Sequence, residues 1–196
     1  MRVFIAVNLS TVIKEELQQM QEALSKRTTG FRWVKPELLH ITLKFIGEVS
    51  PDFVSSLSSP FMEFAEKHEP FKLSFKGLGC FPNVHRPRVI WIGVEKGAVE
   101  LSELSEGINE IVANLQPHDR DQPGKKGKEG NKKEGKFIPH LTLGRRKKEG
   151  PVSLDKDLFE EEWYCANDLH VDGFYIMQST LKPSGPIYTP LEKIML

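Results

Sequence analysis

The chain of 196 residues has few cysteines, no net charge and no long apolar run. Cys80 and Cys165 are too few for a disulfide scaffold and match no metal-ligand spacing, so we expect a reduced, cytoplasmic protein. The 27 basic and 27 acidic residues cancel, so overall basicity does not indicate a nucleic-acid partner. No stretch approaches the roughly 18 to 20 apolar residues that cross a bilayer, and we expect no membrane partner. Residues 1–8 are too short and too alternating for a signal peptide and predict a first strand.

One tetrapeptide pattern occurs twice in a chain that has only 6 histidines. Residues 40–43 read His-Ile-Thr-Leu, and residues 140–143 read His-Leu-Thr-Leu. Both copies lie in short apolar runs that predict β-strands, where alternate side chains share a face. His40 and Thr42 then point to one side, and Phe45 joins the apolar residues that point to the other. Two such units facing each other would form a paired acid–base site.

The hydrophobic pattern predicts an α+β fold in a single domain that spans residues 1–196. Expected helices cover residues 11–27, 51–68 (with a break or kink at Pro60) and 99–115. Expected strands cover residues 3–7, 40–46, 71–78, 88–94, 137–143, 169–177 and 187–190. A strand, a helix and a His-x-Thr-Leu strand follow one another in each half, which indicates an internal duplication.

Residues 117–136 differ from the rest of the domain because they are rich in lysine and glycine and carry almost nothing that packs. Such a segment buries too little apolar surface to offset the entropy of ordering, so we expect a mobile loop. It leads directly into the second motif. One interpretation is an electrostatic lure for a polyanion, and the other, which we favour, is a solvated insertion.

The paired motifs suit the hydrolysis of a phosphodiester without a metal or other cofactor. Histidine has the unperturbed pKa nearest neutrality, so one ring can donate a proton to a leaving group while the other accepts one from water. Thr42 and Thr142 would donate hydrogen bonds to the non-bridging oxygens, where charge builds up in the transition state. Arg145 would add a cationic clamp. Strict alternation places it on the face opposite His140, so it reaches the site only if the strand ends or bulges near Gly144.

Other interpretations of these residues have less support. Zinc binding through His40 and His140 lacks an Asp, Glu or Cys at a usual ligand spacing, and no serine or cysteine occupies a nucleophile elbow. The remaining histidines have no repeated context and are expected at the surface: His68, His85, His118 and His170. The aromatic residues near the motifs are expected in the core, although one at the cleft could stack on a base: Trp33, Phe45 and Trp91.

With these motifs the chain resembles the two-histidine phosphoesterase superfamily, and more narrowly the RNA 2′,3′-cyclic phosphodiesterases, also called 2′-5′ RNA ligases. The matching segments are residues 1–7, 32–47, 81–91, 139–145 and 181–188. The family resemblance implies a bilobal, pseudo-duplicated α+β fold with two antiparallel sheets flanking a cleft, helices outside them and no metal. The Lys/Gly-rich segment 117–136 looks longer and more basic than is usual in the family.

The same resemblance implies hydrolysis of a 2′,3′-cyclic phosphate at an RNA 3′ end to a 2′-phosphate. His40 would be the proton donor to the leaving 3′ oxygen, and His140 the proton acceptor that activates water. The partners would be RNA ends, including tRNA fragments, or small cyclic nucleotides, bound by a monomer. Three alternatives stay open: an ATP-independent 2′-5′ RNA ligase, a phosphodiesterase that acts on a small cyclic nucleotide, and an RNA-binding module that does not turn over its ligand.

Overall fold

The computed structural model of the protein describes residues 1–116, 137–183 and 185–196. The segment predicted as a mobile loop, residues 117–136, lies outside the described residues. The described helices are α1 (Thr11–Ser25), α2 (Pro51–Ala65) and α3 (Ala98–Leu115), with two short 3-10 helices, η1 (Pro36–Leu38) and η2 (Lys156–Phe159). The described strands are β1 (Arg2–Asn8), β2 (Thr28–Thr29), β3 (Phe31–Trp33), β4 (His40–Glu48), β5 (Phe71–Leu73), β6 (Phe75–Phe81), β7 (Val89–Val94), β8 (His140–Arg146), β9 (Ser153–Leu154), β10 (Leu169–Val171), β11 (Gly173–Lys182) and β12 (Gly185–Met195).

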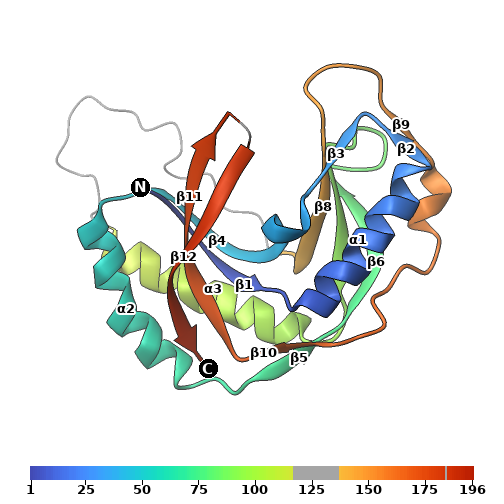
Figure 1. Cartoon of the computed structure of the whole chain (residues 1–196). Helices are drawn as coiled ribbons and strands as arrows, with labels where there is room; N and C mark the ends of the chain where they lie inside the picture. The colour runs from blue at the N-terminus through green and yellow to red at the C-terminus, as the bar shows by residue number, and fades with distance from the viewer. Residues whose placement is uncertain (117–136, 184) are drawn as a thin grey trace.

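Two antiparallel four-stranded sheets organise the molecule, which confirms the predicted α+β class. The first has the order β12-β11-β1-β4 and the second β3-β8-β7-β6. Two-stranded pairings, β10-β5 and β2-β9, complete the described strands. The two motif strands, β4 and β8, contact each other. Figure 1 shows the two sheets side by side, with α2 and α3 beside the first and α1 beside the second.

The predicted duplication is visible in strand register. β1-α1-β4 in one half corresponds to β7-α3-β8 in the other, and each first strand pairs antiparallel with its motif strand. Each pairing shifts register at the leucine of the motif, so Leu43 and Leu143 have no direct partner. The equivalent pairs are Ala6 with Thr42, Trp91 with Thr142, Ile5 with Lys44 and Ile90 with Gly144. Each helix packs against the motif strand of the other half: α1 packs against β8, and α3 packs against β4.

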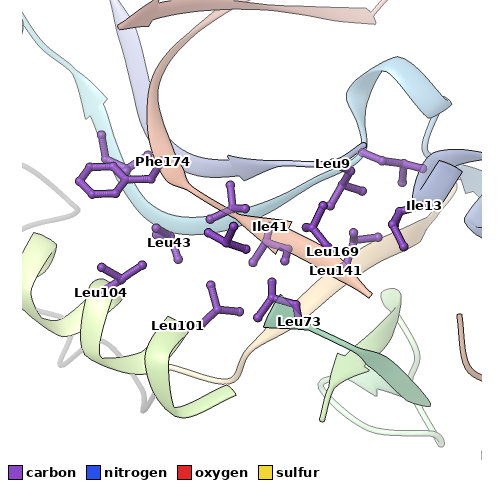
Figure 2. Close-up of a cluster of buried hydrophobic side chains, with 14 of the residues drawn as sticks. Leu9, Ile13, Ile41, Leu43, Leu73, Leu101, Leu104, Leu141, Leu169 and Phe174 are labelled. Carbon is purple, nitrogen blue, oxygen red and sulfur yellow. The ribbon is translucent and has the colours of Figure 1, made fainter. Parts of the chain in front are cut away.

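The core lies under both motif strands. Helix α1 begins at the cap residue Ser10, whose side chain accepts a hydrogen bond from the backbone of Ile13. The apolar face of α1, which includes Ile13, Leu17 and Leu24, is buried, and the side chains beneath the motifs lie with it in one cluster (Figure 2). Ile41, Leu43, Leu141 and Leu143 are each at most 4% exposed, so the undersides of both motif strands are anchored in apolar packing.

Several sequence expectations need correction. Phe45 was expected in the core, yet it is 59% exposed, because the irregularity at Leu43 turns the residues beyond it to the other face. Trp33 and Trp91 are only partly buried. Helix α2 continues through Pro60, and the strand expected at 71–78 is divided into β5 and β6. No helix of the described residues is long and apolar enough to cross a membrane.

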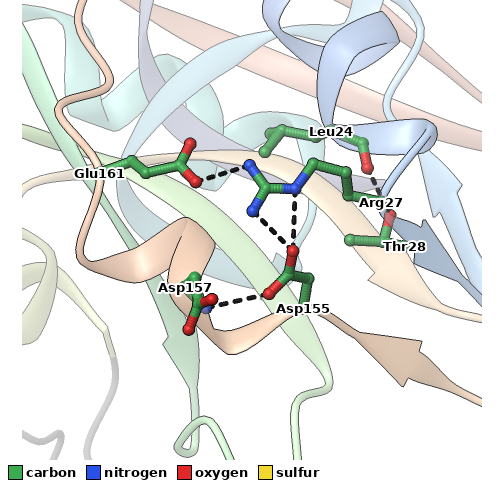
Figure 3. Close-up of polar contacts among 6 residues, drawn as sticks. All are labelled: Leu24, Arg27, Thr28, Asp155, Asp157 and Glu161. Atoms are coloured by element: carbon green, nitrogen blue, oxygen red, sulfur yellow. Dashed lines mark hydrogen bonds and ion pairs between the residues drawn. The ribbon is translucent and has the colours of Figure 1, made fainter.

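An ion-pair network fastens the end of α1 to the segment that contains β9 and η2. The Arg27 guanidinium donates to Asp155 and to Glu161, each at a shortest distance of 2.6 Å (Figure 3). The hydrogen bond from Arg27 holds the pKa of the Asp155 carboxyl below its usual range. Thr28, the next residue, is buried and donates its hydroxyl to the Leu24 carbonyl at 2.9 Å. These contacts fix the first residues after α1, which lead into β3 and the first motif.

Candidate active site

The two motif histidines and their threonines line the same cavity. This cavity, of about 50 Å³, is bordered by His40, Thr42, His140, Thr142, Arg145, Tyr188, Val34 and Leu38. A wider cavity of about 540 Å³ adjoins it and shares His140, both threonines and Arg145. The structure therefore brings together all five residues that the sequence singled out, although they come from strands in different sheets.

Backbone contacts orient both imidazoles in the same way. Nδ1 of His40 donates to the carbonyl of Leu38 at 2.8 Å, and Nδ1 of His140 donates to the carbonyl of Ile138 at 2.7 Å. A carbonyl only accepts, so Nδ1 carries the hydrogen in each neutral ring and Nε2 is left as the basic nitrogen. The hydroxyl of Thr42 lies 2.9 Å from Nε2 of His40. Each Nε2 is thus the ring nitrogen that can exchange a proton, and in the neutral ring that of His40 accepts a hydrogen bond from the Thr42 hydroxyl.

Aromatic rings surround each histidine. The His40 ring lies 5.0 Å from Phe4 and 5.2 Å from Tyr188, which it meets edge-on. The His140 ring lies 5.0 Å from Phe81, also edge-on, and 5.8 Å from Trp91. Burial among these rings lowers the pKa of both histidines. The Arg145 cation lowers both pKa values further, and Lys14 adds to the effect at His40 alone.

Arg145 reaches the cavity because β8 is irregular next to Gly144, as strand alternation demands. Thr142 pairs with Trp91, but Gly144 pairs with the adjacent Ile90, so Leu143 is an additional residue in β8. The extra residue returns Arg145 to the face that carries the motif histidine. A Cβ atom at Gly144 would lie 2.9 Å from the ring of Trp33, so this close approach needs glycine.

Two buried polar side chains at this site were not predicted. The amide of Gln21 in α1 donates to the carbonyl of Leu143 at 2.8 Å, and the hydroxyl of Ser105 in α3 donates to the carbonyl of Leu43 at 2.9 Å. Gln21 is 5% exposed and Ser105 is 0% exposed. Each helix therefore donates a hydrogen bond to the leucine at which the motif strand of the other half shifts register. The signal available in the sequence was a polar residue on the apolar face of each helix, four residues after Leu17 and Leu101 respectively.

Among the described residues, the remaining histidines, His68, His85 and His170, border none of these cavities. His68 is half-buried beside Phe64, His85 and His170 are exposed, and His118 lies outside the described residues. Within the described ranges, no group of three or more His, Cys, Asp or Glu side chains is placed to hold a metal ion. Cys80 and Cys165 are buried free thiols.

The fold and the paired His-x-Thr strands define a two-histidine phosphoesterase. The sequence model of the LigT-like phosphoesterases matches residues 7–91. The RNA 2′,3′-cyclic phosphodiesterase of Archaeoglobus fulgidus is 35% identical over 192 residues, which cover 97% of this chain and 98% of that protein. That of Thermotoga maritima is 34% identical and covers 97% and 93%. This chain therefore belongs to the LigT-like phosphoesterase family.

Solved structures share the fold of this chain. The crystal structure of a protein from Thermus thermophilus is 31% identical, has a TM-score of 0.78, and covers 100% of this chain and 98% of that one. The apo form of E. coli LigT is 22% identical, has a TM-score of 0.70, and covers 99% and 96%. At that identity the second likeness concerns the fold alone.

Proposed function

We propose that this chain hydrolyses the 2′,3′-cyclic phosphate at an RNA 3′ end to a 2′-phosphate. The observation that carries the proposal is the single cavity bordered by both histidines and both threonines. The names of the full-length relatives from Archaeoglobus fulgidus and Thermotoga maritima support it. Because each half supplies one histidine, residues 1–196 would act together as one domain. We place the protein in the cytoplasm, because its two free thiols fit a reducing compartment. We also propose that it acts as a monomer.

In the proposed reaction, water attacks phosphorus in line with the bond to the 3′ oxygen. Nε2 of His140 takes a proton from the water as the new P–O bond forms. Nε2 of His40, protonated, gives its proton to the 3′ oxygen as the P–O bond breaks, and the phosphate remains on the 2′ oxygen. Thr42 and Thr142 donate to the non-bridging oxygens, and Arg145 neutralises their charge. The Nδ1–H bonds to backbone carbonyls keep both Nε2 atoms pointed at the substrate.

A second candidate, 2′-5′ ligation, has one observation in its favour. The wider cavity lies on the His140 side, where the nucleophile enters, and its volume of about 540 Å³ far exceeds what water needs. Phe45, Phe81 and Phe137 line it, and aromatic faces suit a stacked base. Oδ1 of Asn109, also in its lining, is buried and has no partner among the described residues. A 5′-hydroxyl nucleoside bound there would replace water as nucleophile, without ATP.

The test is to incubate RNA ending in a 2′,3′-cyclic phosphate with the protein in the presence of EDTA and to identify the product. We expect a 2′-phosphate and no loss of rate with EDTA. His40→Ala and His140→Ala should each lower turnover at least about 100-fold, with folding retained by circular dichroism. Thr42→Ala and Thr142→Ala should cost less, because each removes one hydrogen bond.

The exposed histidine His170 supplies the matched control, and His170→Ala should keep wild-type turnover. Activity that EDTA abolishes and zinc restores would contradict the metal-free mechanism. Tight RNA binding by the wild-type protein without turnover would favour the non-catalytic alternative. Addition of an RNA with a 5′-hydroxyl, followed by a search for a joined product, distinguishes ligation from hydrolysis.

A further inference from the structure

Two arginines stand directly opposite each other beside the histidine cavity. Arg32 on β3 and Arg145 on β8 are antiparallel partners, so their side chains lie on the same face with Cβ atoms about 5 Å apart. Both border a third cavity, of about 360 Å³, that also includes Lys35. Both are exposed at the surface. Because Arg145 also borders the histidine cavity, the arginine pair extends outward from the proposed catalytic site.

This pair lacks counter-charges of the kind that Arg27 has. Arg27 binds two carboxylates, whereas no ion pair joins Arg32 or Arg145 to an acid among the described residues. Glu37 is the acid that borders the same cavity, and it makes no ion pair there among the described residues. Like charges directly opposite each other in a sheet are destabilising. A bound anion would relieve that repulsion, and guanidinium groups match phosphate oxygens in a bidentate geometry.

We infer that Arg32, together with Arg145, binds the phosphate on the 5′ side of the terminal nucleotide. The inference rests on the proposed function, because that phosphate precedes the terminal cyclic phosphate and is separated from it by one ribose. The shared lining of the two cavities, Arg145, Tyr188, Val34 and Leu38, makes a continuous path between the two phosphate positions. The preferred substrate class is then a nucleotide chain with a phosphate on its 5′ side, rather than a free nucleoside cyclic phosphate.

Three substrates separate the contribution of this phosphate from that of the next nucleoside. They are cytidine 2′,3′-cyclic phosphate, the same compound with a 5′-phosphate, and the dinucleotide adenylyl-cytidine 2′,3′-cyclic phosphate. We expect kcat/KM of the wild-type protein to be about tenfold or more higher for the second and third substrates than for the first, as a charge-assisted hydrogen bond implies. In Arg32→Ala this ratio should fall by about the same factor, and Arg32→Lys should restore part of it. Raising the salt concentration should lower the wild-type ratio.

The control variant is Arg146→Ala. Arg146 is the next residue of β8, exposed and equally charged, and it borders none of the three cavities. Its removal should leave the substrate ratio at the wild-type value. An Arg32→Ala protein that keeps the wild-type ratio would overturn the inference while leaving the proposed function standing. So would a preference for the dinucleotide that the 5′-phosphate alone does not reproduce. Failure of the wild-type protein to hydrolyse any of the three would instead contradict the proposed function.

Discussion

The side-chain amide of Gln21 donates a 2.8 Å hydrogen bond to the backbone carbonyl of Leu143, a residue 122 positions further along the chain. The same amide donates to the carbonyl of Val34 at 2.9 Å. Leu143 is the additional residue that returns Arg145 to the site, and its carbonyl also accepts the backbone N–H of Val34 at 2.8 Å. The Gln21 amide is thus the second donor to this carbonyl and links it to the carbonyl of Val34. Loss of a donor to a buried carbonyl is costly. We therefore expect Gln21 to help hold β8 in the irregular form that brings Arg145 to the site.

We expect Gln21→Met, which keeps length and removes the donor, to lower kcat/KM and to lower the free energy of unfolding by about 1–3 kcal/mol. The kinetic loss should arise through Arg145, because that side chain depends on the irregularity at Leu143. In an Arg145→Ala background, Gln21→Met should therefore have no additional effect on kcat/KM. Steady-state kinetics of the two single variants and the double variant, with urea unfolding, measure both quantities.

Thr28→Val is the matched control for this cycle. Thr28 is also buried and also donates to a backbone carbonyl, that of Leu24, but it does not line the histidine cavity or the wider cavity beside it. Thr28→Val should lower the free energy of unfolding about as much as Gln21→Met does, and it should keep the wild-type kcat/KM. Fully additive kinetic effects of Gln21→Met and Arg145→Ala would show that Gln21 does not act through Arg145.

The parts of the site that the sequence predicted were those set by local periodicity. Alternation within residues 40–43 and 140–143 placed each histidine beside its threonine, and burial of the intervening residues followed. Alternation failed at Phe45, because an irregularity depends on pairing with β1 and on a donor from α3. For Arg145, alternation predicted only that the side chain would reach the site if β8 bulged near Gly144. The pairing of β8 with β7 contains that bulge.

Contacts between distant segments were beyond any local pattern. Tyr188 belongs to β12, yet its ring meets His40 edge-on at 5.2 Å. Phe81 and Trp91 lie in segment 81–91, which resembles the family, but the sequence did not predict that they contact His140. Their position beside His140 follows from the β6-β7-β8 order of the second sheet. A residue's neighbours across a sheet depend on strand order and register, which a single sequence specifies only through the whole fold.

Gly79 makes room for one of these rings. A Cβ atom at Gly79 would lie 2.1 Å from the ring of Trp91, its partner on β7. We expect Gly79→Ala to displace Trp91 toward His140 and to lower kcat by about tenfold to a hundredfold, as small misplacements of a catalytic group do. The overpacking should also lower the free energy of unfolding by about 1–3 kcal/mol.

Gly107→Ala is the control for Gly79→Ala. A Cβ atom there would meet the Phe64 ring at 2.2 Å, on the side of α3 that faces α2. Whatever its effect on thermal stability, kcat should stay at the wild-type value. If Gly79→Ala loses stability but keeps full kcat, the position of Trp91 does not matter to His140.

The lowered pKa values of the two histidines predict where activity is greatest. The kcat/KM of a two-group acid–base site is maximal between the two pKa values of the free protein. Because burial and Arg145 lower both, the maximum should lie below pH 6.5, the ordinary pKa of histidine. Arg145→Ala removes a cation that disfavours both imidazolium forms, so both pKa values rise. The pH profile of kcat/KM for Arg145→Ala should therefore be lower overall and have its maximum at higher pH. A maximum at the wild-type pH would show that Arg145 acts only on the substrate.

Lys14 provides a way to shift one histidine without the other. It borders a cavity of about 260 Å³ that His40 also borders, and its charge lowers the pKa of His40 but not that of His140. Lys14→Met should therefore raise the pKa of His40 and leave that of His140 unchanged, as followed by NMR titration of the two rings. The control is Lys26→Met, at the exposed C-terminal end of the same helix, which should change the pKa of neither histidine. Equal shifts of both rings in Lys14→Met would mean that the two sites titrate as one coupled pair, and no shift would mean that solvent screens Lys14 from His40.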